Sequence, residues 1–221
     1  MDLGDRMKAY EETFRDVLPV RMPAVIRLDG KAFHTLTRDC ERPFDLNLRA
    51  CLVEAARAIL EGIPGRMAYC QSDEVSILLI DYNKFDSEQW MRGIVQKMVS
   101  IAASMMGVEF SMRYGKRGYF DGRVFVVPER DIKNYFIWRQ RDAMRNAVSM
   151  AAQAQFSAKQ LHGKHSDAMI DMLKKKGIKF EDYPEWARLG TVVTRRSPLE
   201  AAPVFSKQPS YLSKFLTIED E

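Results

Sequence analysis

The sequence predicts an α+β domain in which strands and helices follow the ferredoxin-like order βαββαβ, with an antiparallel sheet. Apolar runs with strand character at residues 24–29, 66–80 and 123–127 carry this prediction. A polar turn interrupts the middle run, which predicts a hairpin of two strands. Apolar residues at helical spacing fill the gaps between the runs. In this order the first and third strands form the central pair of the sheet.

Three helices are expected in the first part of the chain. The first is amphipathic and spans residues 5–18. Its apolar face consists of Met7, Tyr10, Phe14 and Val17. The second helix follows Asp45, whose side chain can cap the first turn, and it stops near Gly62. The third starts at Asp86 or Ser87 and ends at Gly107.

The first strand, at residues 24–29, has side chains that alternate between the two faces of the sheet. Val25, Arg27 and Asp29 therefore share one face. Ile26 and Leu28 share the other face, which is apolar. The strand ends in Asp29 and a glycine, so a carboxylate lies at the end of the sheet.

Beyond the last strand of the βαββαβ unit the sequence predicts a mainly helical region, and we expect a division into residues 1–130 and 131–221. The second part begins with a long helix to His162, which Ser157 can interrupt. A short helix, a late strand and a tail without clear periodicity follow at 166–176, 189–194 and from about 197.

Composition is typical of a globular protein of 221 residues, with 46% apolar and 29% charged residues. No run approaches the roughly 18 apolar residues of a membrane span, and the N-terminus is too charged for a signal peptide. Three widely spaced cysteines match neither a disulfide framework nor a zinc site. We therefore expect a cytoplasmic protein without a membrane partner.

The net charge of +4 does not by itself require a nucleic-acid partner. Its distribution is more informative, because basic residues gather in clusters. They include Arg113, Lys116, Arg117, Arg123, Arg130, Lys133, Arg139, Arg141, Arg145, Lys174, Lys175, Lys176, Arg195 and Arg196. The simpler interpretation of each cluster is a solvated face.

Three carboxylates should meet at one end of the sheet. The end of the first strand lies beside the hairpin that leads into the third, so Asp29 should lie near Asp73 and Glu74. Neighbouring carboxylates are costly unless a cation neutralises them. Two Mg²⁺ ions shared by Asp29, Asp73 and the carbonyl of Gly30 would do so, and such a pair serves phosphoryl or nucleotidyl transfer.

A stretch of small and polar residues after Asp29 suits a phosphate-binding turn. Gly30 frees the backbone, and the following N–H groups can donate to phosphate oxygens. Lys31, His34 and Thr35 add further donors. The simpler alternative stays open, since Asp-Gly after a strand is an ordinary turn and Ser-Asp-Glu an ordinary hairpin tip.

Five segments resemble the tRNA(His) guanylyltransferases and the related 3′–5′ polymerases, in the order found in that family. They are RLDGKAFHTLT from Arg27, RPFD from Arg42, QSDEVS from Gln71, FDGRVFVVP from Phe120 and YFIWRQRDAMRN from Tyr135. The resemblance implies a palm domain like that of polymerases and nucleotide cyclases, with a helical C-terminal part. It implies a reaction in which the 3′-hydroxyl of a nucleoside triphosphate attacks the activated 5′-phosphate of a tRNA.

The resemblance also implies roles for individual residues. Asp29 and Asp73 would be metal ligands with the Gly30 carbonyl, and Glu74 would belong to the catalytic group. The triphosphate would lie against Lys31, Ala32, Phe33, His34 and Thr35. Further nucleotide contacts would be Arg27, Arg42, Asp45, Ser72 and Lys97, although Asp45 can equally be only a helix cap. Candidate tRNA contacts are Lys116, Arg139, Arg141, Arg145 and Asn146.

One segment departs from the family pattern of the eukaryotic guanylyltransferases. Where these carry a His-Ile-Asn-Asn-Leu-Tyr-Asn-type segment, this chain has Met144 to Met150, and only Asn146 persists. The departure favours the bacterial and archaeal guanylyltransferase-like branch, which repairs truncated tRNA 5′ ends by templating. Strict addition of the extra 5′ G to tRNA(His) is the alternative. The resemblance also implies GTP or other nucleotides as substrates, ATP for 5′ activation and a homotetramer.

Two other functions fit parts of the pattern. A non-catalytic ferredoxin-like RNA-binding module would stack bases on exposed sheet aromatics, but these strands carry mainly Val, Ile and Leu. A nucleotide cyclase would share the palm. The basic helix with Arg139, Arg141 and Arg145 suits a polyanionic partner better.

Overall fold

The computed structural model describes residues 1–82, 84, 86–196 and 200–217. The helices are α1 (Leu3–Glu12), α2 (Phe33–Leu36), α3 (Leu46–Gly62), α4 (Val95–Tyr114), α5 (Glu129–Gln153), α6 (Ala158–Leu161), α7 (Ser166–Lys175), α8 (Glu185–Leu189) and α9 (Ser210–Ser213), with 3-10 turns at Trp90–Gly93 and Phe180–Asp182. The strands are β1 (Ala24–Gly30), β2 (Gly65–Gln71), β3 (Glu74–Leu79), β4 (Phe120–Val126), β5 (Thr191–Val193) and β6 (Glu200–Ala201). None of the helices in these ranges is long and apolar enough to cross a membrane.

The strands form one antiparallel sheet in the order β4-β1-β3-β2-β5-β6. This arrangement confirms the predicted α+β class and the expected pairing of the first and third strands. Asp29 at the end of β1 lies opposite Glu74 at the start of β3. The turn between β2 and β3 is therefore held beside the end of β1.

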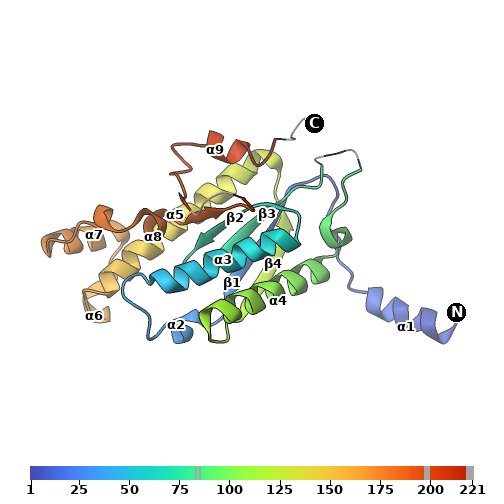
Figure 1. Cartoon of the computed structure of the whole chain (residues 1–221), viewed down its shortest axis with the longest axis horizontal. Helices are drawn as coiled ribbons and strands as arrows, with labels where there is room; N and C mark the ends of the chain where they lie inside the picture. The colour runs from blue at the N-terminus through green and yellow to red at the C-terminus, as the bar shows by residue number, and fades with distance from the viewer. Residues whose placement is uncertain (83, 85, 197–199, 218–221) are drawn as a thin grey trace.

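Helices cover both faces of the sheet (Figure 1). The alternation of β1 decides which side chain meets which helix. Ile26 and Leu28 pack in the cluster with residues of α3 and α4. Val25 packs on the opposite face, in the cluster that contains Ile132 and Phe136 of α5. Arg27 and Asp29 share the α5 face with Val25, which places their charged groups between the sheet and that helix.

The part of the chain beyond residue 130 contributes to the same sheet, because β5 pairs with β2 and β6 pairs with β5. The tail has no long element, yet Phe205 and Leu212 are almost fully buried in the cluster on the α5 face. Phe205 packs edge-on against Tyr69 of β2, with 5.4 Å between the ring centroids. The predicted start of the tail, at residues 197–199, lies outside the described residues.

The first predicted helix is shorter than expected. It ends at Glu12 rather than at residue 18, and none of its residues is buried. The apolar side chains that define its face lie in water in the single chain, with Tyr10 67% and Phe14 77% exposed. Figure 1 shows α1 at one end of the molecule, away from the sheet. Its amphipathic pattern is therefore not explained by packing within one chain.

The third predicted helix has different ends from those expected. It begins at Val95, because Met91 and Arg92 adopt left-handed backbone angles in the preceding 3-10 turn. It continues through Gly107 and ends at Gly115, whose φ of 76° makes it the actual cap. A Cβ at Gly107 would approach the Gly118 carbonyl to 3.3 Å, so this glycine permits close packing inside the helix.

Candidate active site

Asp29 and Asp73 meet where β1 ends and the β2–β3 turn begins. The backbone N–H of Gly30 donates to the carbonyl of Asp73 at 3.1 Å, which joins the two segments. Ser72, which precedes Asp73 in the turn, has a φ of 49°. The chain thus brings two carboxylates from residues far apart in the sequence to the same end of the sheet, as the βαββαβ order requires.

The two carboxylates repel each other. Burial, and then the charge of Asp29, raise the pKa of Asp73 above the ordinary value of 3.8. A cation at this position would relieve both effects, and the Gly30 carbonyl adds a third hard oxygen donor. Among the residues described, no group of three or more His, Cys, Asp or Glu residues is arranged to hold a metal. This small donor set suits Mg²⁺, which keeps water or substrate phosphate as its remaining ligands.

The geometry at Gly30 favours glycine for a different reason from the one expected. Its φ is not in the left-handed region; that conformation occurs at Ala32, with a φ of 56°. A Cβ on Gly30 would instead lie 2.4 Å from Cδ2 of the Phe33 ring. Phe33 is 4% exposed and packs against Phe110. Its side chain therefore belongs to the core, and only its backbone can face a nucleotide.

The following turn has fewer available donors than expected. The N–H of Lys31 donates to the Tyr119 carbonyl at 2.8 Å, and the N–H of Thr35 donates to the Ala32 carbonyl at 2.9 Å. Those two backbone groups are thus used within the chain. Phe33 and His34 open helix α2, where N–H groups have no acceptor within the helix. The side chains of His34 and Thr35 are exposed.

Six of the expected nucleotide contacts and metal ligands line one cavity of about 270 Å³. They are Phe33, His34, Arg42, Asp45, Ser72 and Asp73. Lys97 is exposed near the start of α4 and is not among these lining residues. The other expected nucleotide contacts and metal ligands do not line it either; they are Arg27, Asp29, Gly30, Lys31, Ala32 and Thr35.

Asp45 is the N-cap of α3, as the composition of the segment indicated. One carboxylate oxygen accepts from the N–H of Leu48 at 2.7 Å and the other from the N–H of Glu41 at 3.0 Å. The bond from Leu48 is the main cause that lowers the pKa of Asp45 below 3.8. The carboxylate thus stays ionised and fixed at the wall of the cavity.

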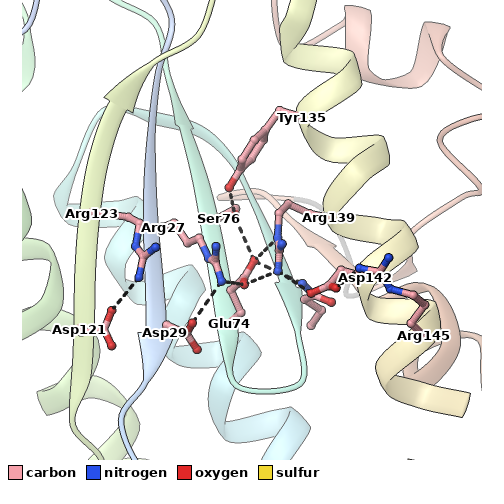
Figure 2. Close-up of polar contacts among 11 residues, drawn as sticks. Arg27, Asp29, Glu74, Ser76, Asp121, Arg123, Tyr135, Arg139, Asp142 and Arg145 are labelled. Carbon is pink, nitrogen blue, oxygen red and sulfur yellow. Dashed lines mark hydrogen bonds and ion pairs between the residues drawn. The ribbon is translucent and has the colours of Figure 1, made fainter. Parts of the chain in front are cut away.

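Two expected roles are corrected by the contacts between β3 and α5 (Figure 2). Arg139 is 4% exposed and donates to both oxygens of Glu74, at 2.8 and 2.6 Å. It is therefore buried and cannot contact a tRNA phosphate. Glu74 is also 4% exposed, and its lone pairs are occupied by Arg139 and other donors. Glu74 is therefore a buried partner of Arg139 and not a group that acts directly on a substrate.

The other candidate tRNA contacts lie on the surface. Lys116, Arg141, Arg145 and Asn146 are all exposed. Lys116 lies 3.7 Å from the exposed Asp39, and Arg145 bonds to Asp142. The Lys116–Asp39 pair is exposed on both sides and therefore weak, so Lys116 remains able to exchange a carboxylate for a phosphate.

Sequence reasoning missed Asp142 and Tyr135 of α5. Asp142 accepts from Arg139 at 2.9 Å, and the Tyr135 hydroxyl lies 2.8 Å from Ser76 Oγ. Burial raises the pKa of Asp142, but its bonds with Arg145 and Arg139 outweigh this and lower it. The spacing of Tyr135, Arg139 and Asp142 along one helix face was a signal that could have identified the group.

The family model for tRNAHis guanylyltransferase matches residues 4–128, which is more than half of the chain. This chain belongs to the tRNA(His) guanylyltransferase family. The match covers both Asp29 and Asp73 and the cavity residues contributed by α2 and α3. The chain is therefore a nucleotidyltransferase of this family, and the fold is its palm-type fold.

Solved structures agree along the whole chain. A bacterial tRNA(His) guanylyltransferase (Thg1)-like protein in complex with ATP is 37% identical, with a TM-score of 0.92 over 99% of this chain and 100% of that one. A bacterial Thg1-like protein in complex with GTP is 33% identical, with a TM-score of 0.82 over 97% and 98% of the two chains. The tRNA(His) guanylyltransferase of Debaryomyces hansenii is 26% identical over 77% of this chain and 72% of its own.

Proposed function

We propose that this member of the tRNA(His) guanylyltransferase family adds nucleotides in the 3′–5′ direction to the 5′ end of tRNA and repairs truncated ends by templating. The observation that carries the proposal is the meeting of Asp29 with Asp73, which lines a cavity together with His34, Arg42 and Asp45. In the reaction, the 3′-oxygen of the incoming nucleotide forms a bond to the 5′-phosphorus of the tRNA, and the activating group leaves that phosphorus.

The metal site consists of the carboxylates of Asp29 and Asp73 and the carbonyl of Gly30. When bound there, two Mg²⁺ ions supply neutralisation of phosphate charge and activation of the attacking hydroxyl. The protein contributes a fixed pair of carboxylates, because the Gly30–Asp73 hydrogen bond holds the two segments together. The raised pKa of Asp73 supports cation binding, since the hydrogen bonds from Ser72 and the backbone compensate the charged form only in part.

The cavity next to Asp73 is proposed to hold the nucleotide. The bacterial Thg1-like structures, which were solved with ATP and with GTP, support a triphosphate ligand of either kind. Phosphate oxygens would meet the N–H groups at the start of α2 and the side chains of His34 and Arg42. Lys97 would need to approach from α4, and we keep it as a candidate triphosphate contact.

The tRNA is proposed to lie over the exposed basic residues of α5 and the loop after α4. Lys116, Arg141 and Arg145 supply positive charge there, and Asn146 supplies a neutral hydrogen-bonding group. Contacts of this kind bind phosphates without regard to sequence. The base to be added must therefore be selected elsewhere, and pairing with the opposite strand of the acceptor stem is the available means.

The departure at Met144–Met150 separates templated repair from strict addition of G to tRNA(His). The chain lacks the His-Ile-Asn-Asn segment of the guanylate-specific enzymes, so base pairing is left to select the incoming nucleotide. A mispaired nucleotide would hold its 3′-hydroxyl out of line with the 5′-phosphate, and misplacement by about 1 Å can cost on the order of a hundredfold in rate. Strict guanylate addition remains the second candidate, because several curated relatives carry the name tRNA(His) guanylyltransferase.

The experiment offers each labelled nucleotide with Mg²⁺ to a tRNA lacking its first base, with the opposing base varied. We expect incorporation to follow pairing, with G opposite C and other nucleotides opposite their partners. Intact tRNA(His) with an unpaired A should receive an extra G slowly under the same conditions. Equal or faster addition opposite A would establish strict guanylate addition in place of repair.

Self-association is proposed from the surface of α1. Leu3, Tyr10 and Phe14 are 66%, 67% and 77% exposed in and just after a helix with no buried residue. Such an apolar face needs a partner, and the tetramer implied by the resemblance would supply one. Light scattering on the whole chain should give a mass of about four protomers. Replacing Tyr10 and Phe14 with Ser should lower it, and a monomeric parent would contradict the proposal.

A further inference from the structure

A row of charged side chains runs from the metal site to the surface of α5 (Figure 2). Arg27 lies 3.2 Å from Asp29 and 2.8 Å from Glu74. Glu74 in turn accepts both bonds from Arg139, and Arg139 lies 2.9 Å from Asp142. Signs alternate along this row, so each inner group has an opposite charge on both sides.

Glu74 has the largest number of hydrogen-bond donors around it in this row. One oxygen accepts from Arg139 Nε at 2.8 Å, with the Gln71 amide and the Ser76 hydroxyl at 3.3 and 3.4 Å. The other accepts from Arg139 at 2.6 Å and lies 2.8 Å from Arg27 Nη2. A carboxylate offers about four lone-pair sites. These five donors leave Glu74 no capacity to bind a metal.

Arg139 is held as firmly as its partner. Its guanidinium pairs with Glu74 through two parallel bonds, a geometry that fixes both groups. The ring of Trp138 lies 4.5 Å from the guanidinium carbon, and only 4% of Arg139 is exposed. Helix α5 therefore presents a rigid cation to β3, and the position of Glu74 follows from it.

We propose that Arg139 and Glu74 are positioning residues, which hold Arg27 away from full pairing with Asp29 and so keep Asp29 available to the metal. Arg27 has two carboxylate partners, and its contact with Glu74 is the shorter. If Glu74 were removed or displaced, Asp29 would be the remaining partner of Arg27. A bidentate Arg27–Asp29 pair would then compete with the cation. This inference rests on the proposed metal site.

The orientation of Asp29 agrees with this role. Its side chain is 33% exposed, whereas those of Arg27 and Glu74 are 18% and 6% exposed. A bond from Arg27 reaches only Asp29 Oδ2 among the oxygens of that carboxylate. The charge of Asp29 is thus partly compensated and still accessible from solvent, as a metal ligand needs.

The test measures Mn²⁺ binding to the whole chain by electron paramagnetic resonance, together with nucleotide addition and thermal stability. Arg139→Met should weaken Mn²⁺ binding by about 10–100-fold, the loss typical when a group that orients a metal ligand is removed. Arg139→Lys keeps the positive charge but loses the two parallel bonds of the guanidinium, so its Mn²⁺ affinity should lie between those of the parent and Arg139→Met. Arg130→Met, an exposed position on the same helix, is the matched control and should bind like the parent.

Arg139→Met could fail to fold because it leaves Glu74 buried with one partner fewer. The double variant Glu74→Gln/Arg139→Met removes both charges, and replacing a whole buried pair is far better tolerated than breaking it. We expect this double variant to fold, to bind Mn²⁺ as weakly as Arg139→Met and to add nucleotides slowly. If Glu74 and Arg139 only stabilise the fold, the double variant should instead recover the Mn²⁺ affinity of the parent.

The outcomes separate this inference from the proposed function. Parental Mn²⁺ affinity in the folded double variant overturns the positioning role and leaves the proposed function intact. Normal Mn²⁺ binding without nucleotide addition to tRNA overturns the function and leaves the positioning role intact. A parent whose Mn²⁺ binding is insensitive to Asp73→Ala overturns both, because the metal site itself is then elsewhere.

Discussion

The backbone N–H of Gly30 donates to the carbonyl of Asp73 across 3.1 Å, and this bond ties the end of β1 to the β2–β3 turn. Both carboxylates of the proposed metal site are carried by these two segments. Their spacing is therefore set by the sheet and does not depend on a bound cation. The cation's contribution is to relieve the repulsion between two groups that the fold has already brought together.

Substitution of Gly30 should disturb nucleotide binding through Phe33. In Gly30→Ala the new Cβ would lie 2.4 Å from the Phe33 ring, which is too close. This ring packs against Phe110 and Phe120, so it has little room to move away. The start of α2 must then move. We expect the apparent Michaelis constant for GTP to rise by about tenfold or more, since shifts of about 1 Å are costly in such sites.

The double variant Gly30→Ala/Phe33→Leu is the control for that mechanism. A smaller side chain at position 33 removes the clash, so part of the affinity for GTP should return. Steady-state kinetics on both variants measure this. An unchanged Michaelis constant in Gly30→Ala would show that the loop tolerates a Cβ and that the contact with Phe33 does not govern nucleotide binding.

Cation binding should depend on pH through Asp73. Its pKa is raised above 3.8, chiefly by burial and then by Asp29. The folded chain therefore takes up this proton at a higher pH than the unfolded chain does. The bound cation must displace the proton, so Mg²⁺ affinity should decline as pH falls toward and through this raised pKa.

Thermal unfolding with and without Mg²⁺ between pH 8 and acid conditions measures that linkage. Without metal, Asp73→Asn removes a buried charge that Asp29 repels, and it should raise the melting temperature at neutral pH by about 2–4 °C for each kcal/mol of repulsion removed. Mg²⁺ should stabilise the parent and not this variant. Equal stabilisation of both proteins by Mg²⁺ would place the ion elsewhere.

Binding of tRNA should depend on salt through exposed basic side chains. Replacing Arg141 or Lys116 with Ala should weaken tRNA binding and reduce the slope of log affinity against log salt by about 0.7–0.9 for each phosphate that is no longer neutralised. Filter binding over a range of salt concentrations measures both quantities. Lys174→Ala on α7 is the control, as Lys174 is an exposed lysine outside the proposed tRNA surface. Parental slopes in the Arg141 and Lys116 variants would identify these residues as ordinary solvated charges.

The central sheet could be predicted because its signals are local. The alternation of β1 fixed the faces of Arg27 and Leu28, and the order of the strands placed Asp29 beside Asp73. The pairing of Glu74 with Arg139 could not be predicted in the same way. It depends on where α5 packs across the sheet, and the two residues are 65 positions apart.

The other differences between the predicted elements and the structure also have physical causes. Left-handed backbone angles at Met91 and Arg92 delay the start of α4, and side-chain periodicity carries no signal for them. Burial of Phe205 and Leu212 arises from isolated apolar residues in short segments, which have no period to detect. The exposed face of α1 shows the converse, a clear helical pattern whose partner is not within the single chain.

The most direct test of the proposed active site is single-turnover nucleotide addition to a 5′-truncated tRNA by the parent, Asp29→Ala and Asp73→Ala at saturating GTP and Mg²⁺. Both carboxylates are assigned as direct metal ligands, so each variant should lose more than the roughly 10–100-fold typical of an outer partner. Circular dichroism should show that both remain folded, since neither side chain belongs to the apolar core. Addition at the parent's rate by folded Asp29→Ala or Asp73→Ala would contradict the proposed two-carboxylate centre.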